Sequence, residues 1–148
     1  EDAAVNEYTW LLHTDTSNTI AAFPKEQSAR IIGSKRGAFC EVQFLYPKNN
    51  LTVEESDLSN ALLPARKNMS DDARLLSRYY KEINAKTTAK NPHFVALVLA
   101  RESDSIAPVI TTKGDATKME VQIRFSNGVT DSLIITSENV AFTRNDSR

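Results

Sequence analysis

The chain has 148 residues, enough for one domain with a sizeable core, and a net charge of −1 with 25% charged residues gives no global field for attracting nucleic acid or an anionic membrane. Only four glycines and one cysteine, Cys40, are present, which excludes a glycine-rich phosphate loop, a disulfide framework and a cysteine-based zinc site. The longest apolar run, 94–100, is far too short for a membrane span. We expect no cofactor and one domain over 1–148, with polar tails at 1–7 and 145–148.

The chain begins with Glu1 rather than methionine, which indicates a processed protein or one whose leader has been trimmed. Its acidic start is typical of a mature exported protein, or of a lipoprotein cut behind its anchor cysteine, although a domain excised from a longer chain would look the same. We expect an extracytoplasmic location, periplasmic or secreted. The cytoplasm is the alternative, which the unpaired Cys40 favours.

Strand patterns dominate the first 46 residues. The range 8–14 is rich in aromatic and aliphatic residues and predicts a strand, and 19–23 is expected to return antiparallel to it. The segment 25–33 allows two interpretations: the proline before it and the glycine at its end favour a short helix, whereas its apolar end favours one arm of a hairpin. A further strand is predicted at 38–46, where apolar and polar residues alternate.

The middle of the chain predicts two helices, at about 53–63 and 71–87. Residues 52–55 have capping-box spacing, and a proline ends the first helix. Residues 70–72 supply a hydroxyl cap and two acids for the positive end of the second helix dipole. Apolar residues then recur at helical spacing through 73–83.

Strand patterns return after the predicted helices. The range 93–100 is apolar on both faces, which predicts a central strand. A shorter strand at 106–112 contains Pro108, which indicates a sheet edge. A last short strand is predicted at 139–143. The order predicts an α+β fold: an antiparallel β-sheet or β-sandwich with two helices inserted between an N-terminal and a C-terminal set of strands.

The clearest signal is a hairpin across 116–137, where apolar and charged residues alternate before an Asn-Gly turn. A two-residue loop would gain one exposed charge pair across the strands. A three-residue loop at 126–128 instead pairs Val121 with Leu133 and leaves only Asp131 badly placed. Each buried aliphatic side chain contributes roughly 1.5–3 kcal/mol, against about 0.2–1 kcal/mol for one exposed pair, so we expect the three-residue loop.

No residue pattern defines a catalytic or metal site. Cys40 with His13 or His93 would in principle supply a nucleophile and a base, but a lone cysteine within a strand is typically a small core residue. Acidic clusters at 54–57 and 71–72 lie where helix capping alone would place them. These patterns favour a protein that is not an enzyme.

The spacing of three basic residues places them on one face of the second predicted helix, beside a tyrosine at the margin of its apolar stripe. We expect partner contacts there and on the predicted edge strand, at Arg74, Arg78, Tyr79, Lys81, Pro108 and Val109. The sequence thus predicts a non-enzymatic protein-binding or assembly module, which contacts a protein partner through a strand edge or the helix pair. The alternatives are a nucleic-acid-associated domain that uses the basic helix face, and a hydrolase whose residues converge only on folding. No oligomeric state is favoured.

Overall fold

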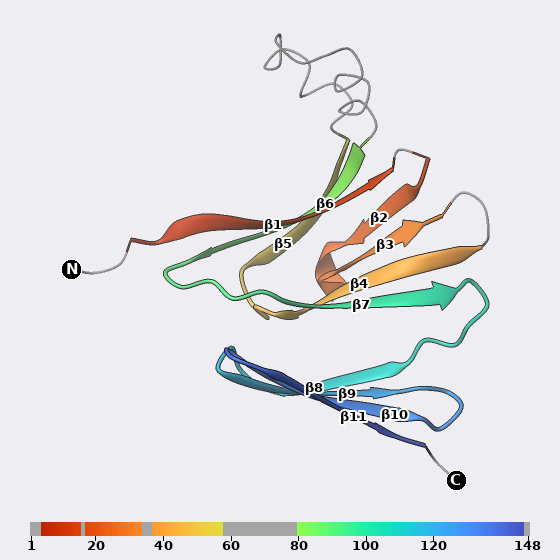
Figure 1. The fold of residues 1–148 in the computed structure, drawn as a ribbon. Helices are drawn as coiled ribbons and strands as arrows, with labels where there is room; N and C mark the ends of the chain where they lie inside the picture. The colour runs from red at the N-terminus through yellow and green to blue at the C-terminus, as the bar shows by residue number, and fades with distance from the viewer. Residues whose placement is uncertain (1–3, 16, 34–36, 58–79, 147–148) are drawn as a thin grey trace. The chain divides into compact units, whose positions relative to one another are not determined.

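The structure is a computed structural model that describes residues 4–15, 17–33, 37–57 and 80–146. The described residues form three antiparallel sheets in two compact units, Glu1–Ser103 and Asp104–Arg148 (Figure 1). The single domain predicted for 1–148 stays a prediction. The first unit contains β1 (Asn6–Asp15), β2 (Thr19–Phe23), the 3-10 helix η1 (Pro24–Glu26), β3 (Ser28–Ile32), β4 (Ala38–Tyr46), β5 (Leu51–Asp57), β6 (Tyr80–Ala89) and β7 (Val95–Glu102). The second contains β8 (Val109–Gly114), β9 (Lys118–Arg124), β10 (Thr130–Thr136) and β11 (Val140–Asn145).

The α+β prediction is wrong, because the described parts of both predicted helices are strands. The start of the 53–63 segment belongs to β5 and the end of the 71–87 segment belongs to β6, while 58–79 lies outside the described residues. In β5, Leu51 and Val53 are buried while their neighbours are exposed, a period of two rather than a helical period. Pairing between strands therefore overrides the local capping signal.

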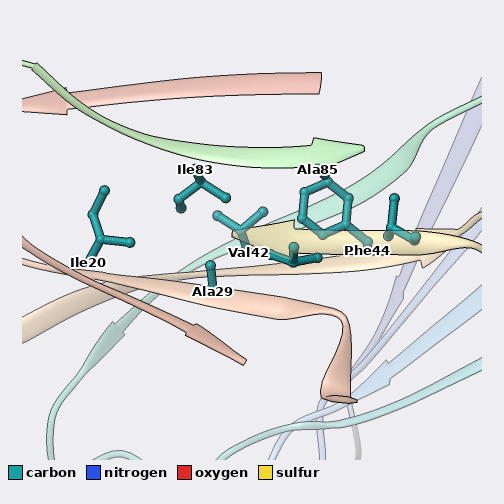
Figure 2. Packing of buried hydrophobic residues seen from close by; sticks show 8 residues of the cluster. Ile20, Ala29, Val42, Phe44, Ile83 and Ala85 are labelled. Atoms are coloured by element: carbon teal, nitrogen blue, oxygen red, sulfur yellow. The ribbon is translucent and has the colours of Figure 1, made fainter. Parts of the chain in front are cut away.

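The two sheets of the first unit enclose its core. Their strand orders are β1-β6-β5 and β2-β3-β4-β7. Ile83 and Val53 from the first sheet and Val42 from the second are each 0% exposed, and Figure 2 shows Ile83 and Val42 lying between the two layers. Trp10 of β1 meets Phe44 of β4 edge to face, with ring centroids 5.0 Å apart and ring planes at 87°. Both sheets therefore contribute large side chains to one core.

Three expectations for the first unit need correction or refinement. β2 pairs with β3 and β1 with β6, so β2 does not return along β1 as predicted. The segment 25–33 combines both interpretations, since it lies across η1 and β3, which meet at the left-handed residue Gln27. β7 lies at the edge of its sheet rather than at the centre, and Val98 on one of its faces is exposed.

The second unit is a meander of consecutive strands in the order β11-β10-β9-β8. Its central hairpin confirms the three-residue loop: Val121 lies opposite Leu133, and Phe125 donates its N–H to the Val129 oxygen at 2.9 Å. Gly128 has the left-handed φ of 88° that such a loop requires. The apolar residues of β9 are buried and its charged residues are exposed, as the alternation predicts.

Candidate functional site

β8 forms one edge of the four-stranded sheet in the second unit, which confirms the edge position predicted for 106–112, although the strand begins at Val109 and Pro108 lies before it. It pairs with β9 on one side, with Thr111 opposite Gln122. Val109, at its start, is 52% exposed, and Ile106 before the strand is 74% exposed. Backbone and apolar groups are thus available together on this edge.

The turn between β8 and β9 determines which backbone N–H and C=O groups of β8 point toward β9 and which point away from it. Asp115 donates its N–H to the carbonyl oxygen of Lys118 at 3.1 Å. Bonded and non-bonded pairs alternate along an antiparallel ladder, so the N–H and C=O groups of Ile110 and Thr112 point away from β9. Pro108 is an even-numbered residue like Ile110 and Thr112, so its missing N–H would point away from β9 and its absence removes no bond to β9. Among the described strands β8 has β9 as its one neighbour, so the sheet presents these backbone groups at an open edge.

The polar face of this sheet is hollowed beside the edge. A hollow of about 450 Å³ lies across β8, β9 and β10. A second, of about 210 Å³, adjoins it and shares two lining residues, Thr111 and Gln122. Other residues that line these two hollows include Val109, Lys113, Glu120, Arg124, Thr130 and Ser132. Hydroxyl and amide groups here can form hydrogen bonds to another chain.

Two of the six predicted partner residues are consecutive in the chain and lie at the β8 edge. They are Pro108 and Val109. Lys81 lies in the other unit, in β6, where its ammonium donates to the Asn18 carbonyl oxygen at 2.9 Å. Since Lys81 belongs to a strand, the helical spacing that grouped it with other basic residues does not apply to it. The remaining three, Arg74, Arg78 and Tyr79, lie outside the described residues.

A polar cluster in the first unit was not predicted from the sequence. His13, Glu82 and Ser56 lie opposite one another on β1, β6 and β5. Ser56 Oγ donates to Glu82 Oε1 at 2.6 Å, Asn84 Nδ2 donates to the same oxygen at 2.8 Å, and His13 Nε2 lies 3.3 Å from Glu82 Oε2. Recognising strands at 51–57 and 80–89, with their period of two, could have placed these side chains on one face.

The electrostatics of this cluster favour a charged Glu82. Burial by itself raises the pKa of Glu82, but hydrogen bonds from Ser56 and Asn84, together with the bond and charge of His13, outweigh it and lower the pKa overall. Because Ser56 donates to a carboxylate rather than to an imidazole, this arrangement does not activate its hydroxyl as a nucleophile. The cluster holds a buried carboxylate in place.

A cation–aromatic stack crosses the β2-β3-β4-β7 sheet. The Arg30 guanidinium lies 5.3 Å from the ring centroid of Phe23 and 5.1 Å from that of Phe39, and Arg101 lies 5.1 Å from the Phe39 ring. Glu41 pairs with both arginines, at 3.5 Å to Arg30 and 2.7 Å to Arg101. These contacts join all four strands of the sheet and so support its structure.

Cys40 is a thiol rather than a thiolate in this environment. It lies in β4 between Ile31 of β3 and Ala100 of β7 and is partly buried, and burial raises its pKa. In the ranges that the structure describes, no three or more His, Cys, Asp or Glu side chains gather as a metal site would require.

None of the helical structure in the described part of the chain has the length and apolar character needed to cross a bilayer. No protein family matches this chain, and comparisons with curated proteins and with solved structures found no match either. The site therefore rests on its geometry alone.

Proposed function

We propose that this protein is a non-enzymatic protein-binding or assembly module, and that β8 is the edge at which a protein partner adds a strand. The observation that carries this proposal is the row of outward backbone groups at Ile110 and Thr112, beside the exposed side chains of Val109 and Ile106. In strand addition, main-chain hydrogen bonds supply affinity and side-chain contacts supply specificity.

The two faces of the sheet define the partner strand. On one face, its side chains would extend the polar surface that contains Thr111 and Lys113, so small or polar residues suit these positions. On the other face, they would continue the row formed by Ile110 and Ile123, which lie opposite each other. An extended segment with alternating polar and apolar residues fits both faces.

A proline pair tests this mode of binding. Thr112→Pro removes an outward N–H and leaves the β8–β9 ladder intact, so it should abolish partner binding while preserving the fold. Thr111→Pro removes an inward N–H and should destabilise the sheet itself. The unfolding midpoints of both variants establish which hydrogen bond each proline removes.

Partner binding is measured by photocrosslinking of the protein in an extract of the source organism. A photoreactive residue in place of Val109 should capture a discrete protein, and the capture should disappear when Thr112→Pro is added. The same residue in place of Glu138, in the turn after β10, is the matched control. Equal capture at both positions, no discrete partner, or capture that survives Thr112→Pro in a folded chain contradicts the proposal.

A further inference from the structure

β11 forms the other edge of the sheet in the second unit, and all six of its residues are exposed. Two are large apolar residues: Val140 is 57% exposed and Phe142 is 56% exposed. They lie opposite Ile135 and Leu133 of β10 and so continue the apolar face of the sheet, whose β9 residues, such as Val121, are buried. An open edge with exposed apolar side chains is a template for pairing with another strand.

This edge lacks several of the features that usually prevent such pairing. Val140–Asn145 contains no proline, glycine or lysine. Its only charged residue is Arg144, whose guanidinium is directed back over its own sheet: Nε donates to Asp131 Oδ1 and Nη2 donates to Asp131 Oδ2, both at 2.7 Å. The guanidinium also lies over the ring of Phe142, 5.9 Å from its centroid, so the charge is held over the face of the sheet and leaves the backbone groups of the edge open.

The backbone phase of β11 matches a second copy of itself. Thr136 donates its N–H to the Asn139 oxygen at 2.8 Å in the turn that leads into β11. Because hydrogen-bonded and non-bonded pairs alternate along the two strands, Val140, Phe142 and Arg144 are in non-bonded pairs with β10. Their N–H and C=O groups therefore point away from β10, toward the open edge. These three residues are symmetric about Phe142, so a copy related by a two-fold axis meets each outward residue with another outward residue.

We propose that a second copy of this chain docks on β11, with the two β11 strands antiparallel and Phe142 opposite Phe142 of the second copy. Val140 then lies opposite Arg144 of the second copy, so no like charges face each other directly. The central aromatic pair is a favourable cross-strand contact, and a net charge of −1 per copy produces little mutual repulsion.

The resulting dimer joins two four-stranded sheets into one continuous sheet. It leaves β8 at both outer edges, so this inference goes beyond the proposed function and does not depend on it. A contact formed by one strand edge is small, which places the dimer among weak and reversible interfaces.

Sedimentation velocity of the full chain over about 10–500 µM tests the dimer, because weak interfaces dissociate in this range. We expect the dimer fraction to rise with concentration. Phe142→Ser should raise the dissociation constant at least about tenfold, as expected for loss of a central anchor. Ile134→Ser is the matched control: Ile134 is also partly exposed but lies on the other face of the neighbouring strand β10, so the dissociation constant should stay within about twofold.

Cysteine pairs test the register in a Cys40→Ser background. Ala141 and Thr143 of two copies lie opposite in a non-bonded pair, where Cα atoms are about 4.5 Å apart and a disulfide can form. A mixture of Ala141→Cys and Thr143→Cys chains should crosslink far better than either variant alone. A chain that stays monomeric, a dimer that Phe142→Ser leaves unchanged, or crosslinking of Ala141→Cys mainly with itself overturns the proposal. Thr112→Pro should not change dimerisation, which separates this test from that of the β8 edge.

Discussion

The carboxylate of Asp131 and the guanidinium of Arg144 face each other across β10 and β11 and share two hydrogen bonds of 2.7 Å. The Asp131 side chain is only 8% exposed, because the register of the central hairpin places it opposite Ile123 on the apolar face. The hydrogen bonds from Arg144 lower the pKa of Asp131; burial opposes this, and the charge of Arg144 adds to it. The ion pair is what lets a carboxylate occupy this face.

Asp131→Asn should lower the thermal stability of the protein in a pH-dependent way. The folded pKa of Asp131 lies below its unfolded value, so the unfolded chain binds the proton first as the pH falls. The stabilisation is complete above the unfolded pKa, about 3.9, and is lost as the pH falls through the folded pKa. The difference in unfolding midpoint between the wild type and Asp131→Asn, measured by circular dichroism, should be largest near neutral pH and shrink in acid. A difference independent of pH would contradict this.

Glu82→Ala should destabilise the first unit much more than Glu54→Ala. Removing Glu82 leaves the buried Asn84 amide and the partly buried Ser56 hydroxyl without the acceptor that they share, and loss of a hydrogen bond to a buried group costs about 1–3 kcal/mol. Glu54 forms only an exposed pair with Lys86 at 3.1 Å, which contributes about 0–1 kcal/mol. Denaturant unfolding of the two variants measures the difference, and equal losses would show that the cluster is not a stabilising network.

Ile83→Ala should reduce the free energy of unfolding by about 2–5 kcal/mol, since the side chain is fully buried between the two sheets and its loss leaves a cavity. Leu11→Ala on the neighbouring strand β1 provides the control. Half of Leu11 is exposed, so its truncation should cost less than about 1 kcal/mol. Urea titrations that find the two losses similar would argue against the core assigned to the first unit.

Gly114→Ala should destabilise the β8–β9 hairpin. Gly114 has a φ of 100°, and an added Cβ would collide with the carbonyl oxygen of Lys118, so we expect a loss of more than about 1 kcal/mol. Gly33→Ala is the control, because the nearest atom to its added Cβ is the Ala38 oxygen at an ordinary 3.7 Å. Thermal unfolding of both variants checks the contrast, and a stable Gly114→Ala chain would be inconsistent with this turn.

The central hairpin of the second unit was predictable because the residues that determine its faces and its turn are neighbours in the sequence. Alternating residues define both faces of β9, and the left-handed Gly128 lies beside the residues that it joins. The strand β5 was not predictable in the same way. Its capping-box residues are a local signal for a helix, whereas its actual partner, β6, lies beyond 58–79 in the sequence. Long-range pairing outweighed a weak local preference.

The candidate site was predictable only in part. Pro108 indicated an edge strand from its missing N–H, a property of one residue. The cluster of His13, Ser56 and Glu82 comes from three strands that are distant in the sequence. The period of two can assign each side chain to a face of its own strand, but it does not show which strands are neighbours. The apolar composition of β7 predicted a central position in the sheet, but composition does not show whether a second strand pairs with its other side.

The pairing of β1 with β6 has a consequence for biosynthesis. β1 leaves the ribosome before the other described strands. Its neighbour in the sheet, β6, with Asn6 beside Ala89 and Asp15 beside Tyr80, is translated only after most of the first unit. Until β6 is made, β1 lacks its partner strand, and in this period a nascent chain can bind chaperones or misassemble. The second unit pairs only successive strands, so each hairpin can close soon after it emerges.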